Sequence, residues 1–207
     1  MSVTYYRPYF DVDTVDVKER LKMSVSAIVG KRTFLDTVES KPDLFGPFWI
    51  CATLIFCIGA TSNFSSYLSF VPTKDVPKWN YDFTLLTAAA SFISGFCIIV
   101  PLGLYFVARY LALPLTLVQL LCIYGYAHSI YILAAFVSMM PSVFFSWLTI
   151  FVAFSVASSF IGFNLSTFLR GKGVDMGKAN SLIGGAVLVH AAFAILLKLY
   201  FFKQLAE

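Results

Sequence analysis

The stretch Asp43-Leu44-Phe45-Gly46-Pro47-Phe48-Trp49 separates a charged segment from a long apolar one. Residues 1–42 carry all but one of the 14 charges among the first 44 positions, whereas Leu44–Thr73 carries none. The glycine–proline pair is predicted to end any preceding helix and to preset the first turn of the next, where the N–H that proline lacks has no intrahelical partner. The two rings that close the stretch suit the headgroup level of a bilayer. We therefore expect Asp43 to lie in water and a membrane span to begin directly after it.

The composition is typical of an integral membrane protein. Of the 207 residues, 59% are apolar and only 13% are charged, whereas a soluble domain carries about 25% charge. The mean hydropathy is +0.81. The net charge of +4 is small, and the basic residues form no long run, so we expect no nucleic-acid partner. The four cysteines lie in uncharged runs without C-x-x-C spacing, which predicts buried thiols and neither a disulfide nor a metal site.

Charge-free runs predict five membrane-spanning helices, because a span needs about 20 apolar residues. The run Tyr110–Leu169 is 60 residues long, enough for two spans, and Met140-Pro141-Ser142 is its natural break. We therefore predict an all-α, polytopic membrane protein, in which residues 43–203 form the membrane domain. Its transmembrane helices are expected at about 47–70, 83–106, 115–139, 143–168 and 180–202.

Residues 1–42 are predicted to form an N-terminal region with a short amphipathic helix over Val15–Val29. Leu21, Val25 and Ile28 would form its apolar face. That face could lie on the bilayer surface, dock on a partner or pack on the protein's own membrane domain. Five spans put the two termini on opposite sides, and 11 Lys and Arg residues fall on the N-terminal side against 4 on the other. This bias predicts a cytosolic N-terminus.

Four polar side chains inside the predicted spans are candidate sites, because polar groups are costly there: Asn63, His128, Asn164 and His190. The two histidines could pair, relay a proton or bind a metal, but no further ligand stands at suitable spacing. We interpret all four as side chains that hydrogen-bond between helices. The sequence Tyr124-Gly125-Tyr126 places a small residue between two hydroxyl-bearing rings, which is typical of close helix packing.

No catalytic constellation is recognisable in the sequence. There is no Ser/His/Asp arrangement, no H-E-x-x-H, no phosphate-binding glycine loop and no pair of carboxylates. The predicted loops are too short to hold a soluble catalytic domain. We therefore expect neither enzyme activity nor a cofactor.

Several stretches resemble the Yip family, the Ypt/Rab-GTPase-interacting membrane proteins of the early secretory pathway. Residues 43–54 resemble the D-L-Y-G-P signature that opens the first span of that family. Residues 122–126 resemble its Y-G-Y motif in the third span. Residues 9–21 and 188–202 are similar to the N-terminal stretch and the last span of one subgroup. Phe45 stands where the signature usually has tyrosine, so the ring is kept and the hydroxyl is lost.

The resemblance implies a multi-pass membrane protein of the Golgi that cycles with the endoplasmic reticulum, with its C-terminus in the lumen. It implies a role in vesicle-mediated transport through Rab-type small GTPases and other Yip-family proteins, in a homo- or hetero-oligomer within the lipid bilayer. The residues that it marks as partner-binding or motif positions are Asp43, Leu44, Phe45, Gly46, Pro47, Tyr124, Gly125 and Tyr126. The alternative is a small transporter or lipid scramblase with a path lined by Asn63, His128, Asn164 and His190.

Overall fold

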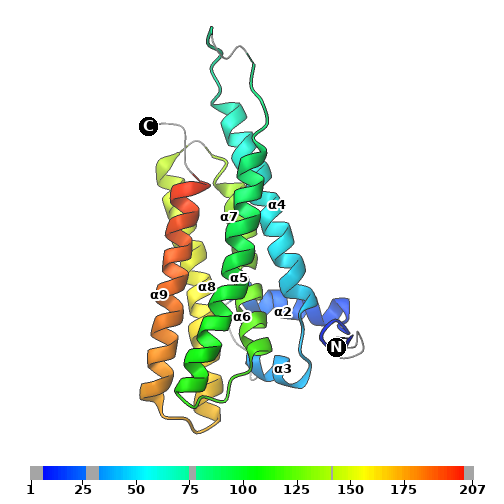
Figure 1. Ribbon diagram of the computed structural model, residues 1–207, viewed down its shortest axis with the longest axis vertical. Coiled ribbons are helices and arrows are strands. Elements are labelled where there is room, and N and C mark those ends of the chain that lie inside the picture. Colours follow the sequence, from blue (N-terminus) through cyan, green and yellow to red (C-terminus); the bar gives the residue numbers. More distant parts are fainter. Residues whose placement is uncertain (1–6, 27–32, 75–77, 141, 203–207) are drawn as a thin grey trace.

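The helices form an upright bundle with a short arm beside its lower part (Figure 1). The computed structural model describes residues 7–26, 33–74, 78–140 and 142–202. The N-terminal arm, residues 7–26 and 33–43, contains the 3-10 helix η1 (Arg7–Tyr9) and the helices α2 (Thr14–Ser26) and α3 (Phe34–Ser40). The bundle contains α4 (Phe45–Leu68), α5 (Phe83–Tyr110), α6 (Leu117–Ala127), α7 (Ser129–Val137), α8 (Val143–Gly171) and α9 (Met176–Tyr200).

Five helical segments are long and apolar enough to cross a membrane, with α6 and α7 together making the third. No strand occurs within the described ranges, so the prediction of an all-α fold with five spans is confirmed. Large apolar side chains stand exposed around the bundle, among them Phe56, Phe106, Phe151 and Leu188. Because a soluble protein rarely exposes so continuous an apolar surface, this belt identifies the face that contacts lipid. Pro141, the predicted break between the third and fourth spans, lies outside the described residues.

The third span is the centre of the bundle. Of its most apolar stretch 67% is buried, against 17% for α5, and it packs on α4, α5 and α8. Its helix is interrupted at His128, where the imidazole Nδ1 bonds to the carbonyl of Tyr124. The backbone N–H of His128 then turns to the carbonyl of Gly125. A side chain that competes for the i−4 carbonyl thus divides the span into α6 and α7.

The N-terminal arm packs on the bundle. Helix α2 contacts α6, α7 and α8, while α3 contacts α6 and α8. The face that α2 turns inward carries Arg20 and Ser24, which are 1% exposed. Of the predicted apolar face, Leu21 is 39% exposed and does not pack on the bundle, Val25 is partly buried, and Ile28 lies outside the described residues. The helix is oriented by polar partners of Arg20 and Ser24, which hydrophobic periodicity does not reveal.

Candidate functional site

Asp43, at the junction of arm and bundle, is fully buried. Its side chain is 0% exposed, so the prediction that it lies in water is wrong. One carboxylate oxygen, Oδ1, accepts the backbone N–H of Gly46 at 2.9 Å. The other, Oδ2, accepts the hydroxyl of Tyr126 at 2.5 Å and lies 2.9 Å from Nη1 of Arg20. We call these four residues the Asp43 cluster. The arm folds back and supplies the cation, and a buried charge persists only when it is paired and hydrogen-bonded.

The backbone around Asp43 is held from both sides as well. Nη2 of Arg20 donates to the carbonyl of Lys41 at 2.6 Å. From the third span, the thiol of Cys122 donates to the carbonyl of Asp43. The carboxylate stands at the start of α4, where the free N–H groups and the helix dipole favour a negative charge. Asp43 therefore ties three elements together: α2, the start of α4, and α6.

The two motifs marked by the family resemblance pack directly against each other. A Cβ added to Gly46 would lie 2.0 Å from the hydroxyl oxygen of Tyr126. A Cβ added to Gly125 would lie 2.3 Å from Cβ and 2.7 Å from Cα of Pro47. Contacts below 3.0 Å essentially never occur for a real Cβ. Gly125 is thus required because the third span meets the backbone of the first, and Gly46 is required because the Tyr126 ring occupies the space of its Cβ.

Most of the motif residues are inaccessible from outside. Six of the eight are buried, and only Leu44 and Phe45 reach the surface. Phe45 is 40% exposed, and its ring lies 6.1 Å from that of Trp49. The hydroxyl of Tyr124 donates to the carbonyl of Ala186 in α9 at 3.2 Å. The arrangement is therefore suited to joining helices.

Two further contacts hold the N-terminal arm on the bundle. The hydroxyls of Ser24 and Ser129 lie 2.9 Å apart. The backbone N–H of Phe34 donates to Oδ1 of Asn164 at 2.8 Å, and the Phe34 ring meets the Tyr126 ring edge-on at 5.3 Å. Arg20, Ser24 and Phe34 were not predicted from the sequence as contact residues. The only available signal was that a chain with few charges kept an arginine on a helix next to the membrane domain.

The intramembrane polar residues separate into a histidine pair and two distant asparagines. His128 and His190 are both fully buried, with ring centroids 5.7 Å apart, and Nε2 of His190 lies 3.2 Å from the hydroxyl of Tyr131. Asn63 exchanges hydrogen bonds of 2.8 and 3.0 Å with the backbone of Asp82 and so fixes the loop before α5. Asn164 is engaged at the other end of the bundle, by the arm. The structure does not bring the four together.

No metal site accompanies these side chains. Within the part of the chain that the structure describes, no group of three or more His, Cys, Asp or Glu residues is placed to hold a metal ion. All four cysteines are free thiols. The Sγ atoms of Cys51 in α4 and Cys97 in α5 lie 2.7 Å apart.

The outer surface of the arm is charged. Nζ of Lys41 donates to Asp16 at 2.5 Å, and this hydrogen bond lowers the pKa of the Asp16 carboxyl below its ordinary value. Lys172 at the end of α8 pairs with Glu39 of α3 at 2.9 Å. On the face of α2 that points away from the bundle, Lys18 and Lys22 are exposed. The arm therefore combines a buried attachment with an accessible charged face.

Comparison with known proteins gives a consistent result. The model of the Yip1 domain matches residues 28–199. The chain is 33% identical over 206 residues to the YIPF1 homolog of Dictyostelium discoideum, covering all of this chain and 57% of that relative. It is 26% identical over 201 residues to YIP5 of Schizosaccharomyces pombe, covering 94% of this chain and 78% of that relative. The chain thus spans little more than half the length of the Dictyostelium relative. No solved structure matches it significantly.

Proposed function

Because the chain belongs to the Yip1 domain family, we propose that it binds Rab-type small GTPases and acts in vesicle-mediated transport at Golgi and endoplasmic reticulum membranes. The mechanism is binding without catalysis. The five spans anchor the protein, and the N-terminal arm presents the surface that the GTPase contacts. The observation that carries this proposal is the arm itself, which three buried polar contacts, made by Asp43, Ser24 and Phe34, fix against the bundle.

The contact surface in this proposal is the outer face of α2. Lys18 and Lys22 lie one helical turn apart, and Val15 and Leu21 beside them are 74% and 39% exposed. Charged groups around accessible apolar side chains are typical of an interface that selects its partner electrostatically. In this mechanism Asp43 is a positioning residue, because its buried carboxylate holds the arm and is out of a partner's reach.

Binding to full-length protein tests the proposal. The protein is reconstituted in nanodiscs and exposed to a panel of purified Rab-type GTPases, each loaded with GDP or with a non-hydrolysable GTP analogue. We expect at least one GTPase to bind in one nucleotide state. Reversing charge in the Lys18→Glu/Lys22→Glu variant is expected to weaken that binding, because the change replaces the two exposed lysines of α2 and leaves the arm's buried contacts in place.

Lys178→Glu is the matched control, since Lys178 is also an exposed lysine but lies near the start of α9, away from the arm. It is expected to bind the GTPase as the unaltered protein does. Absence of binding across the panel, relative to empty nanodiscs, would contradict the proposed function. Equal weakening by the control would show only a general charge effect and would remove α2 as the contact surface.

Location in cells is tested separately. We propose that a fluorescent fusion of the chain colocalises with a Golgi marker and that it associates there with itself or with other Yip-family proteins. Proximity labelling from the N-terminus is expected to recover such relatives and Rab proteins. A fusion that instead accumulates at the plasma membrane or in mitochondria would contradict the proposed place of action.

A further inference from the structure

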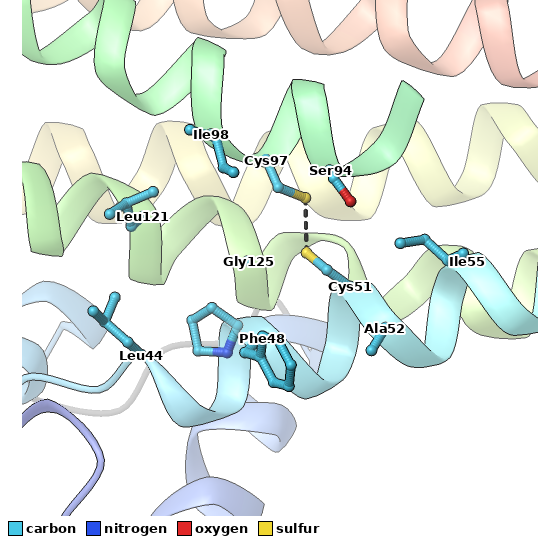
Figure 2. Close-up of a pocket in the computed structure, with 11 residues that line it drawn as sticks. Leu44, Phe48, Cys51, Ala52, Ile55, Ser94, Cys97, Ile98, Leu121 and Gly125 are labelled. Carbon is cyan, nitrogen blue, oxygen red and sulfur yellow. Dashed lines mark hydrogen bonds between the residues drawn. The ribbon is translucent and has the colours of Figure 1, made fainter. Parts of the chain in front are cut away.

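A cavity of about 320 Å³ lies between α4, α5 and α6. Figure 2 shows Cys51 of α4 facing Cys97 of α5, with Gly125 of α6 beside them, and Ala52 of α4 is also part of the lining. Its lining is almost entirely apolar. The two thiols are each other's partners at 2.7 Å, and Ser94 supplies the only hydroxyl among the lining residues.

The cavity opens toward the surface that contacts lipid. Phe48 and Ile98, both part of its lining, are 60% and 59% exposed and belong to the outer faces of α4 and α5. Both helices are spans, so the molecules that surround this opening in a membrane are lipid chains. The cavity offers too few polar groups to hold ordered water, because a buried water molecule needs two to four hydrogen-bond partners.

We propose that this cavity binds one acyl chain of a membrane lipid. Its volume is at the lower end of the range of about 300–1,000 Å³ that small-molecule pockets occupy. A helix of a partner protein is about 10 Å across, so it is too wide for the cavity and could insert only its side chains. An unfilled apolar cavity forfeits the dispersion contacts of its walls. A flexible hydrocarbon chain restores those contacts and requires no polar partner, which matches the chemistry of the lining.

The bound chain would also contact the wall that holds the Asp43 cluster. Leu44 and Pro47, which follow Asp43 and Gly46 in sequence, line the cavity together with Gly125, and Pro47 packs closely on Gly125. A ligand that binds only the folded arrangement stabilises it by mass action. Lipid in the cavity would therefore strengthen the junction of the first and third spans. This inference is independent of GTPase binding.

Photocrosslinking tests the proposal. The full-length protein is placed in phosphatidylcholine nanodiscs that contain a small fraction of phosphatidylcholine with a diazirine on its acyl chain. After illumination, adducts are mapped by peptide mass spectrometry. We expect adducts on Cys97 and Cys51, and a several-fold lower yield on Cys97 in Ala52→Trp, because the indole would occupy the cavity. Ala60→Trp is the matched control, since Ala60 is also half-buried on α4 but does not line the cavity.

Ser94→Phe provides a second variant, which obstructs the cavity from the exposed face of α5 and spares the core. It is likewise expected to lower the yield on Cys97. Absence of adducts on Cys97, or an unchanged yield in both cavity variants, would overturn the proposal. Chain dimers formed by a bismaleimide at Cys51, together with absent lipid adducts, would assign the cavity to a helix of a second copy and would overturn it as well.

Discussion

The carboxylate of Asp43 is a buried charge whose partners come from three different elements. Replacing one member of such a pair leaves the other charge buried without compensation, which costs about 3–5 kcal/mol. We therefore expect Asp43→Asn to lower the free energy of unfolding by about that amount, since asparagine keeps the size of the side chain but leaves Arg20 unpaired. Denaturant unfolding of the purified protein in detergent micelles measures the change.

A double-mutant cycle separates this pair from general packing. In Arg20→Met/Asp43→Asn both charges are gone, so part of the lost stability should return, with a coupling of about 0.5–3 kcal/mol. Strictly additive losses would show that Arg20 and Asp43 do not stabilise each other. Lys172→Met is the control, because it breaks the exposed Lys172–Glu39 pair, whose expected contribution is about 0–1 kcal/mol.

Gly125 gives a second test of the same junction. A Cβ at this position meets the ring and Cα of Pro47, and neither can move without shifting the first turn of α4. Overpacking of this kind costs about 1–3 kcal/mol or more, so Gly125→Ala should lower the thermal unfolding temperature. Gly103→Ala is the control, since nothing lies within 4 Å of its added Cβ. If both variants unfold at the same temperature, the first and third spans do not pack at backbone distance.

The importance of these positions was partly predictable from the sequence, but their geometry was not. Resemblance marked Asp43, Gly46, Gly125 and Tyr126. Local charge patterns then indicated a water-exposed carboxylate, because they contain no information about a partner on a separate helix. Arg20 reaches Asp43 only after the arm folds back, so its pairing depends on tertiary structure. The only signal in the sequence was the small number of charges in a membrane protein, which suggests that each charged residue has a partner or a function.

Disulfide crosslinking of Cys51 and Cys97 can test the contact between the first and second spans. Their Sγ atoms lie 2.7 Å apart, so a mild oxidant such as copper–phenanthroline should join α4 to α5 by a disulfide. A protease site inserted in the loop over 69–82 allows the bond to be seen. After cleavage, the two fragments should migrate together on a non-reducing gel and separate when the thiols are reduced.

Single replacements decide which cysteines react. Cys51→Ala is expected to abolish the crosslink, whereas Cys57→Ala, on the same helix and nearly fully buried, should leave it intact. A crosslink that persists without Cys51 would mean that α4 and α5 face each other in a different register.

Hydrophobic periodicity does not reveal which face of α2 packs on the bundle or that the third span is interrupted, and the physical reason is the same in both cases. On α2 the face that packs carries Arg20 and Ser24, because their partners Asp43 and Ser129 are polar. In the third span the imidazole of His128 takes a carbonyl from its own helix and so interrupts it. Specific polar contacts determine both the packed face of α2 and the interruption of the third span. A pattern of apolar residues does not show which carbonyl or carboxylate a polar side chain will bind.

At the scale of the whole molecule, the number of spans was the most predictable feature, because bilayer thickness sets the length of each. Each span needs about 20 apolar residues, and the charge-free runs of the chain supply enough for the five spans observed. What the runs do not specify is the order of burial. The third span is central and α5 is peripheral. This difference arises because the close glycine contacts and the arm both pack on the third span.

An odd number of spans places the two termini on opposite sides of the membrane, and the distribution of Lys and Arg predicts which side each occupies. Eleven of these residues fall on the N-terminal side and four on the other. Because basic flanks resist translocation, we expect the N-terminus to be cytosolic and the loop over 69–82 and the C-terminus to be lumenal. Glycosylation acceptors carried on inserted spacers measure this in microsomes: those in the 69–82 loop and after residue 207 should be modified, and those at the N-terminus and between α8 and α9 should not.

The role of the basic residues in orientation can be tested by mutation, because they lie outside the spans and can be replaced without changing a span. Replacing Arg170, Lys172 and Lys178 by glutamine removes three of the eleven from the loop between the last two spans. The remaining eight still outnumber the four opposite, so the pattern of glycosylation should not change.

An inverted pattern in the unaltered protein would contradict the orientation. Partial modification at every site would indicate two coexisting orientations, in which case the N-terminal arm would face the cytosol in only some molecules and would bind GTPases in that fraction alone.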